Sequence, residues 1–161
     1  MADEKEIASA GRVYAALCGI LEDKAWDYDS DKEIMTVSFE LQSESVPIAF
    51  VIIVDVERQL LRIYSPLQVK FSQENRIDGS AAVCFASYAL CNGSFDYDLF
   101  DGSIVFRMVT SFNGSLISEA LIEDMINCTC TVVEKYSEKF SGLENGKISI
   151  DDFIRTDEYS L

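Results

Sequence analysis

The stretch Asn92-Gly-Ser-Phe-Asp-Tyr-Asp-Leu-Phe-Asp-Gly-Ser-Ile-Val-Phe-Arg-Met-Val-Thr110 decides the fold, because its pattern is typical of a β-hairpin. Apolar residues alternate on both sides of Asp101-Gly102. Asp-Gly favours a two-residue type I′ turn, in which both central residues adopt positive φ. That turn places Leu99 opposite Ile104, Tyr97 opposite Phe106, Phe95 opposite Met108 and Asp96 opposite Arg107. The register predicts one apolar and one polar face for this hairpin.

The remainder of the chain divides into helical and strand patterns. Apolar residues have helical spacing in three segments. The first is 4–22, the second runs from an N-cap at Asp78 towards a C-terminal cap at Gly93, and the third is 116–140, which Gly142 ends. Strand patterns run over 35–41, 47–54 and 60–64, the last ended by Pro66. The acidic segment 26–31 resembles a turn. The run 47–54 is apolar on both faces, which predicts a central strand covered on both sides. Contact with a partner could cover one of those faces.

The predicted order is therefore α-β-β-β-α-β-β-α. Short connections between neighbouring strands favour an antiparallel sheet, so we expect an α+β fold with five strands and three helices, packed mainly on one face. Residues 1–142 would form a single domain. The acidic tail 143–161 would be loosely held, with a short helix near 151–155.

Composition limits the classes of partner. The net charge is −15, from 28 acidic and 13 basic residues. Nucleic acids and anionic membranes are bound through basic patches, so neither partner is expected. The negative charge either keeps the protein soluble or attracts a basic partner. No stretch of 18 apolar residues and no signal pattern is present, which gives a cytoplasmic location as the expectation. The odd number of cysteines, five, favours a reducing compartment without disulfides.

A family resemblance rests on the hairpin and its surroundings. The segments Ala-Leu-Cys-Asn92-Gly93-Ser-Phe95, Phe95-Asp-Tyr-Asp98 and Asp101-Gly-Ser-Ile-Val-Phe-Arg107, in this order of elements, resemble the YbjN family of bacterial proteins. The match covers about residues 5–140, with the tail outside it. Members are described as regulators of sensory transduction, and their fold is similar to that of the type III secretion chaperones. Those chaperones are small, acidic and usually dimeric, and they hold an extended partner segment against an apolar surface.

Candidates for chemistry are few. The chain contains no histidine, which removes Ser-His-Asp and Cys-His catalysis and histidine-bearing zinc sites. Cys128-x-Cys130 lies in a helical pattern that points the two thiols to different sides, so a buried structural role is expected. Asp96 with Arg107 could be an acid beside a substrate clamp, but a cross-strand ion pair is the expectation.

Two acidic stretches have partial calcium-loop patterns. Asp27-x-Asp29-x-Asp31 lacks the glycine and the final glutamate of such a loop. The stretch Asn145–Phe153 resembles the second half of an EF-hand loop, but Ser141 and Leu143 occupy its first and third positions. We expect solvated acidic turns at both places, and we assign no catalytic, cofactor-binding or metal-binding residue to the chain.

These observations predict a non-enzymatic protein-binding regulator or chaperone-like adaptor of YbjN type. Its partner is an unidentified protein, and a homodimer is expected because the strand 47–54 and the last long helix carry more apolar surface than one helical layer covers. The alternative is a small-molecule sensor with a pocket between sheet and helices, and an enzyme using carboxylates alone is a third class that the residues favour less.

Overall fold

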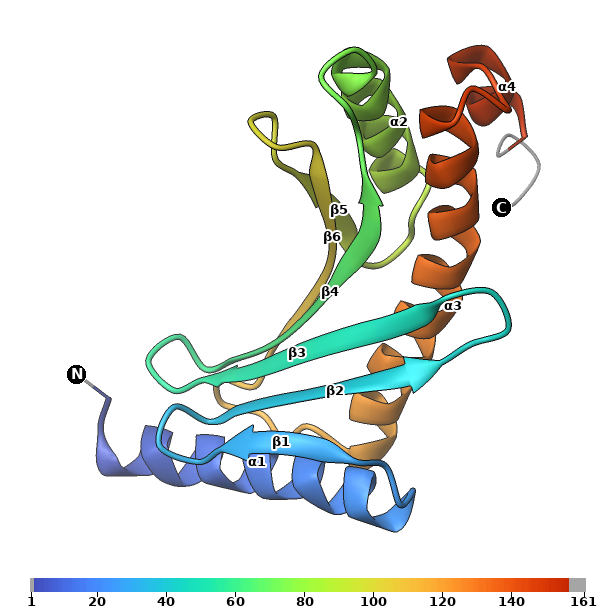
Figure 1. Cartoon of the computed structure of the whole chain (residues 1–161). Coiled ribbons are helices and arrows are strands. Elements are labelled where there is room, and N and C mark those ends of the chain that lie inside the picture. Colours follow the sequence, from blue (N-terminus) through green and yellow to red (C-terminus); the bar gives the residue numbers. More distant parts are fainter. Residues whose placement is uncertain (1, 157–161) are drawn as a thin grey trace.

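The computed structural model of the chain describes residues 2–156 and has an α+β fold (Figure 1). The elements are α1 (Glu4–Asp23), β1 (Tyr28–Asp31), β2 (Thr36–Gln42), β3 (Pro47–Asp55), β4 (Leu60–Lys70), α2 (Arg76–Tyr88), β5 (Ser94–Tyr97), β6 (Ser103–Ser111), α3 (Glu119–Glu144) and α4 (Ile150–Arg155). The strands form one antiparallel sheet in the order β1-β2-β3-β4-β6-β5. The predicted fold class and antiparallel sheet are confirmed, whereas the sheet has six strands instead of five and four helices are described.

The additional strand is β1, which occupies most of the segment predicted as a turn. Tyr28 pairs with Phe39 and Asp31 with Thr36, so β1 forms one outer edge of the sheet. Its sequence, Tyr-Asp-Ser-Asp, lacks the apolar alternation that marks a strand. An edge strand needs only one neighbour, and the pairing with β2 holds it in place despite its poor strand propensity.

The β5–β6 hairpin forms, but its predicted register is wrong. Phe95 lies opposite Phe106 and Tyr97 opposite Ile104, which is a shift of two residues that leaves the inward face unchanged. The loop is longer than two residues, and Gly102 has a φ of 77° whereas Asp101 does not adopt positive φ. The amide of Phe71 donates to the Gly102 carbonyl at 3.0 Å, and a Cβ on Gly102 would lie 2.1 Å from the Phe71 carbonyl oxygen. The loop is therefore shaped by the end of β4, which sequence alternation does not report.

Among residues 2–156, helices cover one face of the sheet and leave the other open. Inward side chains of β3 are buried, while its outward residues are only partly shielded. In Figure 1, β1 and β2 cross in front of α1 and α3, so these helices lie behind the sheet. Within residues 2–156, the chain itself therefore covers 47–54 on one side only, and cover of the other side by a partner stays a prediction. The outward apolar residues, which do not pack on the core, are Ala49, Val51, Ile53, Leu60, Tyr64, Val105 and Val109.

Strand β4 continues beyond its predicted end. It reaches Lys70 with Pro66 inside it, and a register shift against β6 occurs between these two residues. Pairing with β3 ends at Tyr64, so the rest of β4 has β6 as its neighbour. Pro66 is tolerated because a strand edge without a partner on one side does not need every backbone donor.

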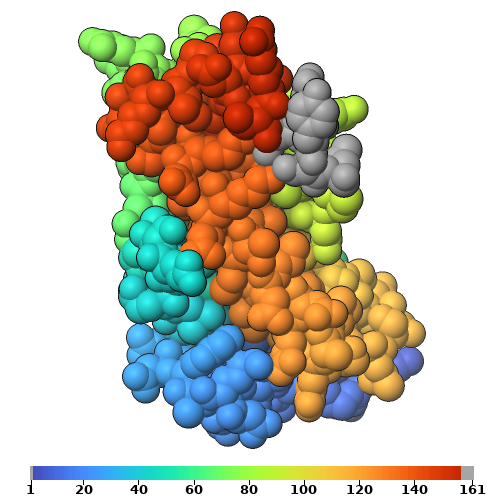
Figure 2. Space-filling view, turned by 90° about the vertical axis from the view of Figure 1, so that its right-hand side faces the viewer, coloured from blue at the N-terminus to red at the C-terminus, as the bar shows by residue number. Residues whose placement is uncertain are grey.

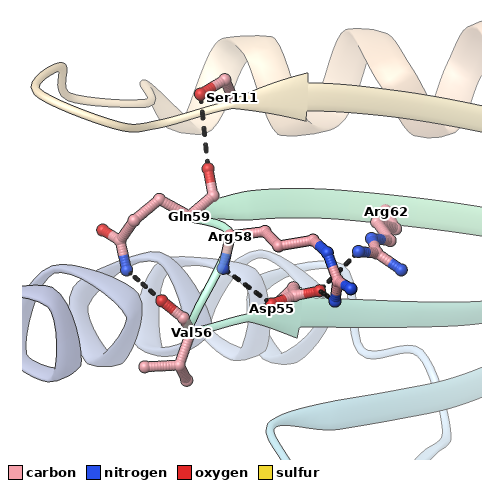
Figure 3. A network of polar contacts seen from close by, with 6 residues as sticks. All are labelled: Asp55, Val56, Arg58, Gln59, Arg62 and Ser111. Carbon is pink, nitrogen blue, oxygen red and sulfur yellow. Dashed lines mark hydrogen bonds and ion pairs between the residues drawn. The ribbon is translucent and has the colours of Figure 1, made fainter. Parts of the chain in front are cut away.

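The turn between β3 and β4 connects the sheet to α1 (Figure 3). Asp55 accepts a hydrogen bond from the Arg58 amide at 2.9 Å and forms an ion pair with Arg62 at 2.5 Å. Gln59 adopts a φ of 51°, and its side-chain amide donates to the carbonyls of Val56 at 2.6 Å and Glu6 at 3.1 Å. These bonds satisfy partly buried backbone oxygens and fix the N-terminal end of α1 against the sheet.

Helix α3, the longest of the described helices, begins and ends later in the chain than the predicted range of 116–140. It begins after the N-cap Ser118 and continues through Gly142 to Glu144. An aromatic cluster joins it to neighbouring elements, with Phe140 contacting Phe71, Phe95, Tyr136 and Phe153 at ring-centroid distances between 5.3 and 6.2 Å. The predicted short helix near 151–155 is α4, and its Phe153 is buried in this cluster. The predicted tail thus begins inside α3, where Leu143 is buried, and its residues 157–161 lie outside the described residues.

Candidate protein-binding surface

Helix α2 packs closely on the sheet because its inward residues are small. Gly79, Ala82, Val83 and Ala86 are buried. A Cβ on Gly79 would lie 2.5 Å from the Phe71 ring, so this position requires glycine. Ser87 accepts a hydrogen bond from the Phe95 amide at 2.9 Å, which fixes the helix to β5.

The start of α2 differs from the prediction. The helix begins at Arg76 with Asn75 as its N-cap, and Asp78, the predicted cap, lies in the first turn. The Asn75 side chain donates instead to the backbone carbonyl of Glu144 at 3.0 Å, which ties α2 to the end of α3. Gly93, the predicted C-terminal cap, lies beyond the C-cap Ala89 and has a φ of 79° in the loop before β5.

The outward side of α2 is apolar. Ile77, Ala81, Cys84 and Tyr88 are all exposed, and their spacing of four, three and four residues places them in one stripe. Ile77 has 79% and Tyr88 88% of its surface exposed. Asp78 is the one charged residue among the exposed positions of the helix. A stripe of this kind on a surface helix usually faces another protein or a core.

The tip of the β5–β6 hairpin carries two further exposed apolar residues near the start of α2. Phe100 is 94% and Leu99 64% exposed. Arg76, at the first position of α2, donates to the Phe100 carbonyl at 2.5 Å and to the Leu99 carbonyl at 3.3 Å. The hairpin tip is thus held beside the N-terminal end of α2, and both lie at the top of Figure 1. We call the α2 stripe with Leu99 and Phe100 the α2 surface.

Helix α3 has the opposite outward composition. Figure 2 shows it running across the side of the molecule, beneath α4 and beside the β2–β3 turn. Its exposed positions beyond the first turn are polar or charged, and they are Asp124, Asn127, Thr131, Lys135 and Glu138. We expected this helix to carry more apolar surface than one helical layer covers. Its apolar stripe is instead buried along its length, with Cys128 and Cys130 half-buried beside it.

The residues singled out for chemistry have structural surroundings. Burial raises the pKa of the Cys128 and Cys130 thiols, which holds them protonated at neutral pH. Arg107 donates to both oxygens of Asp96, at 2.7 and 3.1 Å, and this carboxylate raises the pKa of Arg107. The predicted ion pair therefore forms, although the two residues are diagonal neighbours, because Asp96 lies opposite Val105.

The two partial calcium patterns form local turns and caps. Asp31 accepts hydrogen bonds from the amides of Glu33 and Ile34, at 2.9 and 3.4 Å. Asp152 accepts a hydrogen bond from the Ser149 hydroxyl at 2.7 Å and forms a capping box with Ser149, the N-cap of α4. Within residues 2–156, no three Asp, Glu, His or Cys side chains gather in a way that could hold a metal ion.

Two comparisons bear on the identity of the chain. The sequence matches neither a protein-family model nor a curated protein. Within the described residues, no helix is long and apolar enough to span a membrane. The resemblance to the YbjN family therefore stays a prediction, and the functional argument rests on the α2 surface.

Sequence reasoning missed this surface. The spacing of Ala81, Phe85 and Tyr88 indicates a helix, but α2 carries apolar residues on several sides, so spacing does not tell which side is buried. The signal that the sequence does offer marks the inward side. The small residues Gly79, Ala82 and Ala86 favour close packing on the sheet, so the outward side of α2 is the opposite one.

Proposed function

We propose that this protein is a non-enzymatic protein-binding regulator or chaperone-like adaptor that acts as a homodimer through the α2 surface. The exposed apolar stripe of α2 carries the proposal. Isolated exposed apolar residues are normal, but a continuous stripe on a helix that already buries its other side calls for a partner.

The order of residues in the stripe favours a second copy of this chain. An isologous contact pairs each residue with its counterpart across a two-fold axis. In an antiparallel pair of α2 helices centred between Ala82 and Val83, Ile77 lies opposite Tyr88 and Ala81 opposite Cys84. The small side chains meet at the centre and the large ones at the ends, so the stripe is complementary to itself.

Charge supports the same partner. A chain with a net charge of −15 is repelled by its own copy over most of its surface. Helix α2 carries one arginine and one aspartate, Arg76 and Asp78, and is therefore neutral overall. Two copies can meet on this face without bringing further carboxylates together.

The test is the mass of the protein in solution as a function of concentration. We expect a dimer that dissociates on dilution, measured by sedimentation equilibrium. Tyr88→Asp would place a buried charge at each end of the contact and raise the dimer Kd by about 30-fold or more, as for an aromatic hot spot worth about 2 kcal/mol. Thr131→Asp on the outward side of α3 is the matched control and leaves the Kd unchanged. A monomer at every concentration would refute the dimer.

A second candidate function is small-molecule sensing. A depression of about 700 Å³ lies among the β2–β3 turn, α3 and α4, and Ser45, Val46, Ser137, Ser141 and Ile148 line it. Lys135, Lys139 and Lys147 also line it, together with Glu138 and Asp152, so the lining is slightly basic in an otherwise acidic chain and favours an anionic ligand. Its volume is in the range of small-molecule sites. A rise in melting temperature with phosphate or a dicarboxylate, lost in Lys147→Glu, would support this function.

A further inference from the structure

The open face of the sheet is a second apolar surface, separate from α2. Val51 lies opposite Tyr64 and Ile53 opposite Arg62, while Tyr64 lies opposite Arg107, so these outward side chains form one continuous area over β3, β4 and β6. None of the outward apolar residues packs against the hydrophobic core. Sheet faces of this kind are normally covered by another layer.

Charges at the centre of this face are paired, whereas those towards one edge are not. In its central part, Arg62 is paired with Asp55 and Arg107 with Asp96, at 2.5 and 2.7 Å. Towards β1 and β2, three carboxylates, Asp27, Asp29 and Glu40, line a depression of about 550 Å³ together with Ser38, Ala49 and Val51. Each of the three is exposed and forms no ion pair within the described residues. One side of the apolar area therefore carries uncompensated negative charge.

We propose that the open face binds an amphipathic helix of a partner protein whose basic residues are concentrated at one end. The apolar side of that helix would lie over Val51, Ile53 and Tyr64, and its lysine or arginine residues would meet Asp29 and Glu40. The face from β2 to β6 spans three strand spacings, roughly 14 Å, which corresponds to about ten residues of helix. Burial of apolar area supplies affinity, and the unpaired carboxylates select orientation and charge.

This inference deepens the proposed protein-binding function by naming the class of partner, and the residues that it uses on β1 to β4 are not part of the α2 stripe. The probe is a fluorescein-labelled 14-residue peptide of leucine, alanine and lysine, designed as an amphipathic helix with its lysines in the first five positions. A second peptide has glutamate in place of every lysine. Fluorescence anisotropy reports binding of either peptide to the full chain.

We expect saturable binding of the lysine peptide and no binding of the glutamate peptide. Glu40→Lys combined with Asp29→Lys weakens binding at least tenfold, and so does Val51→Asp, with circular dichroism to verify folding. The matched control is Asp124→Lys combined with Glu138→Lys on the outward side of α3, which makes the same change in net charge and leaves the affinity within about twofold.

Equal losses in the two charge-reversed variants would overturn the proposal, because they would mean attraction by net charge alone. Absence of saturable binding to the unmodified chain would overturn it as well, and so would a fall in dimer mass caused by Val51→Asp, which would make a second copy the occupant of the face. The same titration of Tyr88→Asp separates the two proposals, because we expect this variant to bind the peptide whether or not α2 mediates dimerisation.

Discussion

Helices α2 and α3 both bury one side against the sheet, but their outward sides differ. Beyond its first turn, where Ala120 and Leu121 are exposed, the outward positions of α3 are polar, as expected for a helix that faces water. Those of α2 are apolar apart from Asp78, and they are Ile77, Ala81, Cys84 and Tyr88. A single stable copy requires apolar inward sides on both helices and a polar outward side on α3. It does not explain the α2 stripe, so the comparison separates residues that maintain the fold from residues available to a partner.

The largest expected effect is on the inward side of α3. Phe140→Ala removes a ring that contacts Phe71, Phe95, Tyr136 and Phe153, and it should lower the free energy of unfolding by about 3–5 kcal/mol. Urea denaturation monitored by circular dichroism measures this. A loss below 1 kcal/mol would contradict the position of α3 and α4 around this cluster.

The next effect concerns the start of α3. The Ser118 hydroxyl accepts a hydrogen bond from the Leu121 amide at 3.2 Å, and Ser118→Ala should cost about 1 kcal/mol of unfolding free energy. At α2, the N-cap residue makes no such bond with its side chain. Ser118→Asp, which retains a capping oxygen, is the control and should restore most of the stability.

A smaller effect is expected when the outward side of α2 is truncated. Tyr88→Ala should change the unfolding free energy by less than about 0.5 kcal/mol at protein concentrations below the dimer Kd, because the side chain contacts mainly solvent in a single copy. At concentrations above the Kd, the same substitution should lower the apparent stability, because fewer molecules are dimeric. A large loss at both concentrations would place Tyr88 inside the monomer and erase the difference between the two helices.

The smallest effect is that of salt on association. Raising the NaCl concentration from 0.05 to 0.5 M screens the repulsion between two copies that each carry a charge of −15, so the dimer Kd should fall by a few-fold. Sedimentation equilibrium at both concentrations measures the change. A Kd that rises with salt would indicate a contact made by ion pairs, as the charged outward side of α3 would provide.

The sequence predicts most of the fold because strong local patterns agree with the tertiary contacts. Alternation identified β2 and β6, a continuous apolar run identified β3, and helical spacing identified α1 and α3. Strand β1 was missed since its four residues carry no apolar alternation and are held by pairing with β2. The hairpin register was wrong by two residues because Phe71 and Lys70, distant in sequence, hold its loop, with Lys70 paired to Asp101 at 2.6 Å.

The candidate site was less predictable than the fold. Tyr88 and Phe85 fit the apolar spacing of α2 equally well, and only the packing of Gly79 against Phe71 shows which side faces inward. Likewise, the run 47–54 predicts a strand with two apolar faces, but whether a helix covers the second face depends on the path of the whole chain. Exposure of an apolar residue is a tertiary property that local spacing does not determine.

The central claim, that two copies meet through antiparallel α2 helices, is tested most directly by cross-linking at Cys84. In such a pair, two Cys84 residues lie within about 10 Å of each other near the two-fold axis, whereas Cys91, also exposed, lies beyond the helix end and would be roughly 20 Å or more from its counterpart. We would treat Cys91→Ser and Cys84→Ser variants briefly with a short bismaleimide at neutral pH. Covalent dimer in Cys91→Ser and none in Cys84→Ser is the predicted result. Equal cross-linking in both variants, or none in either, would contradict the proposed dimer.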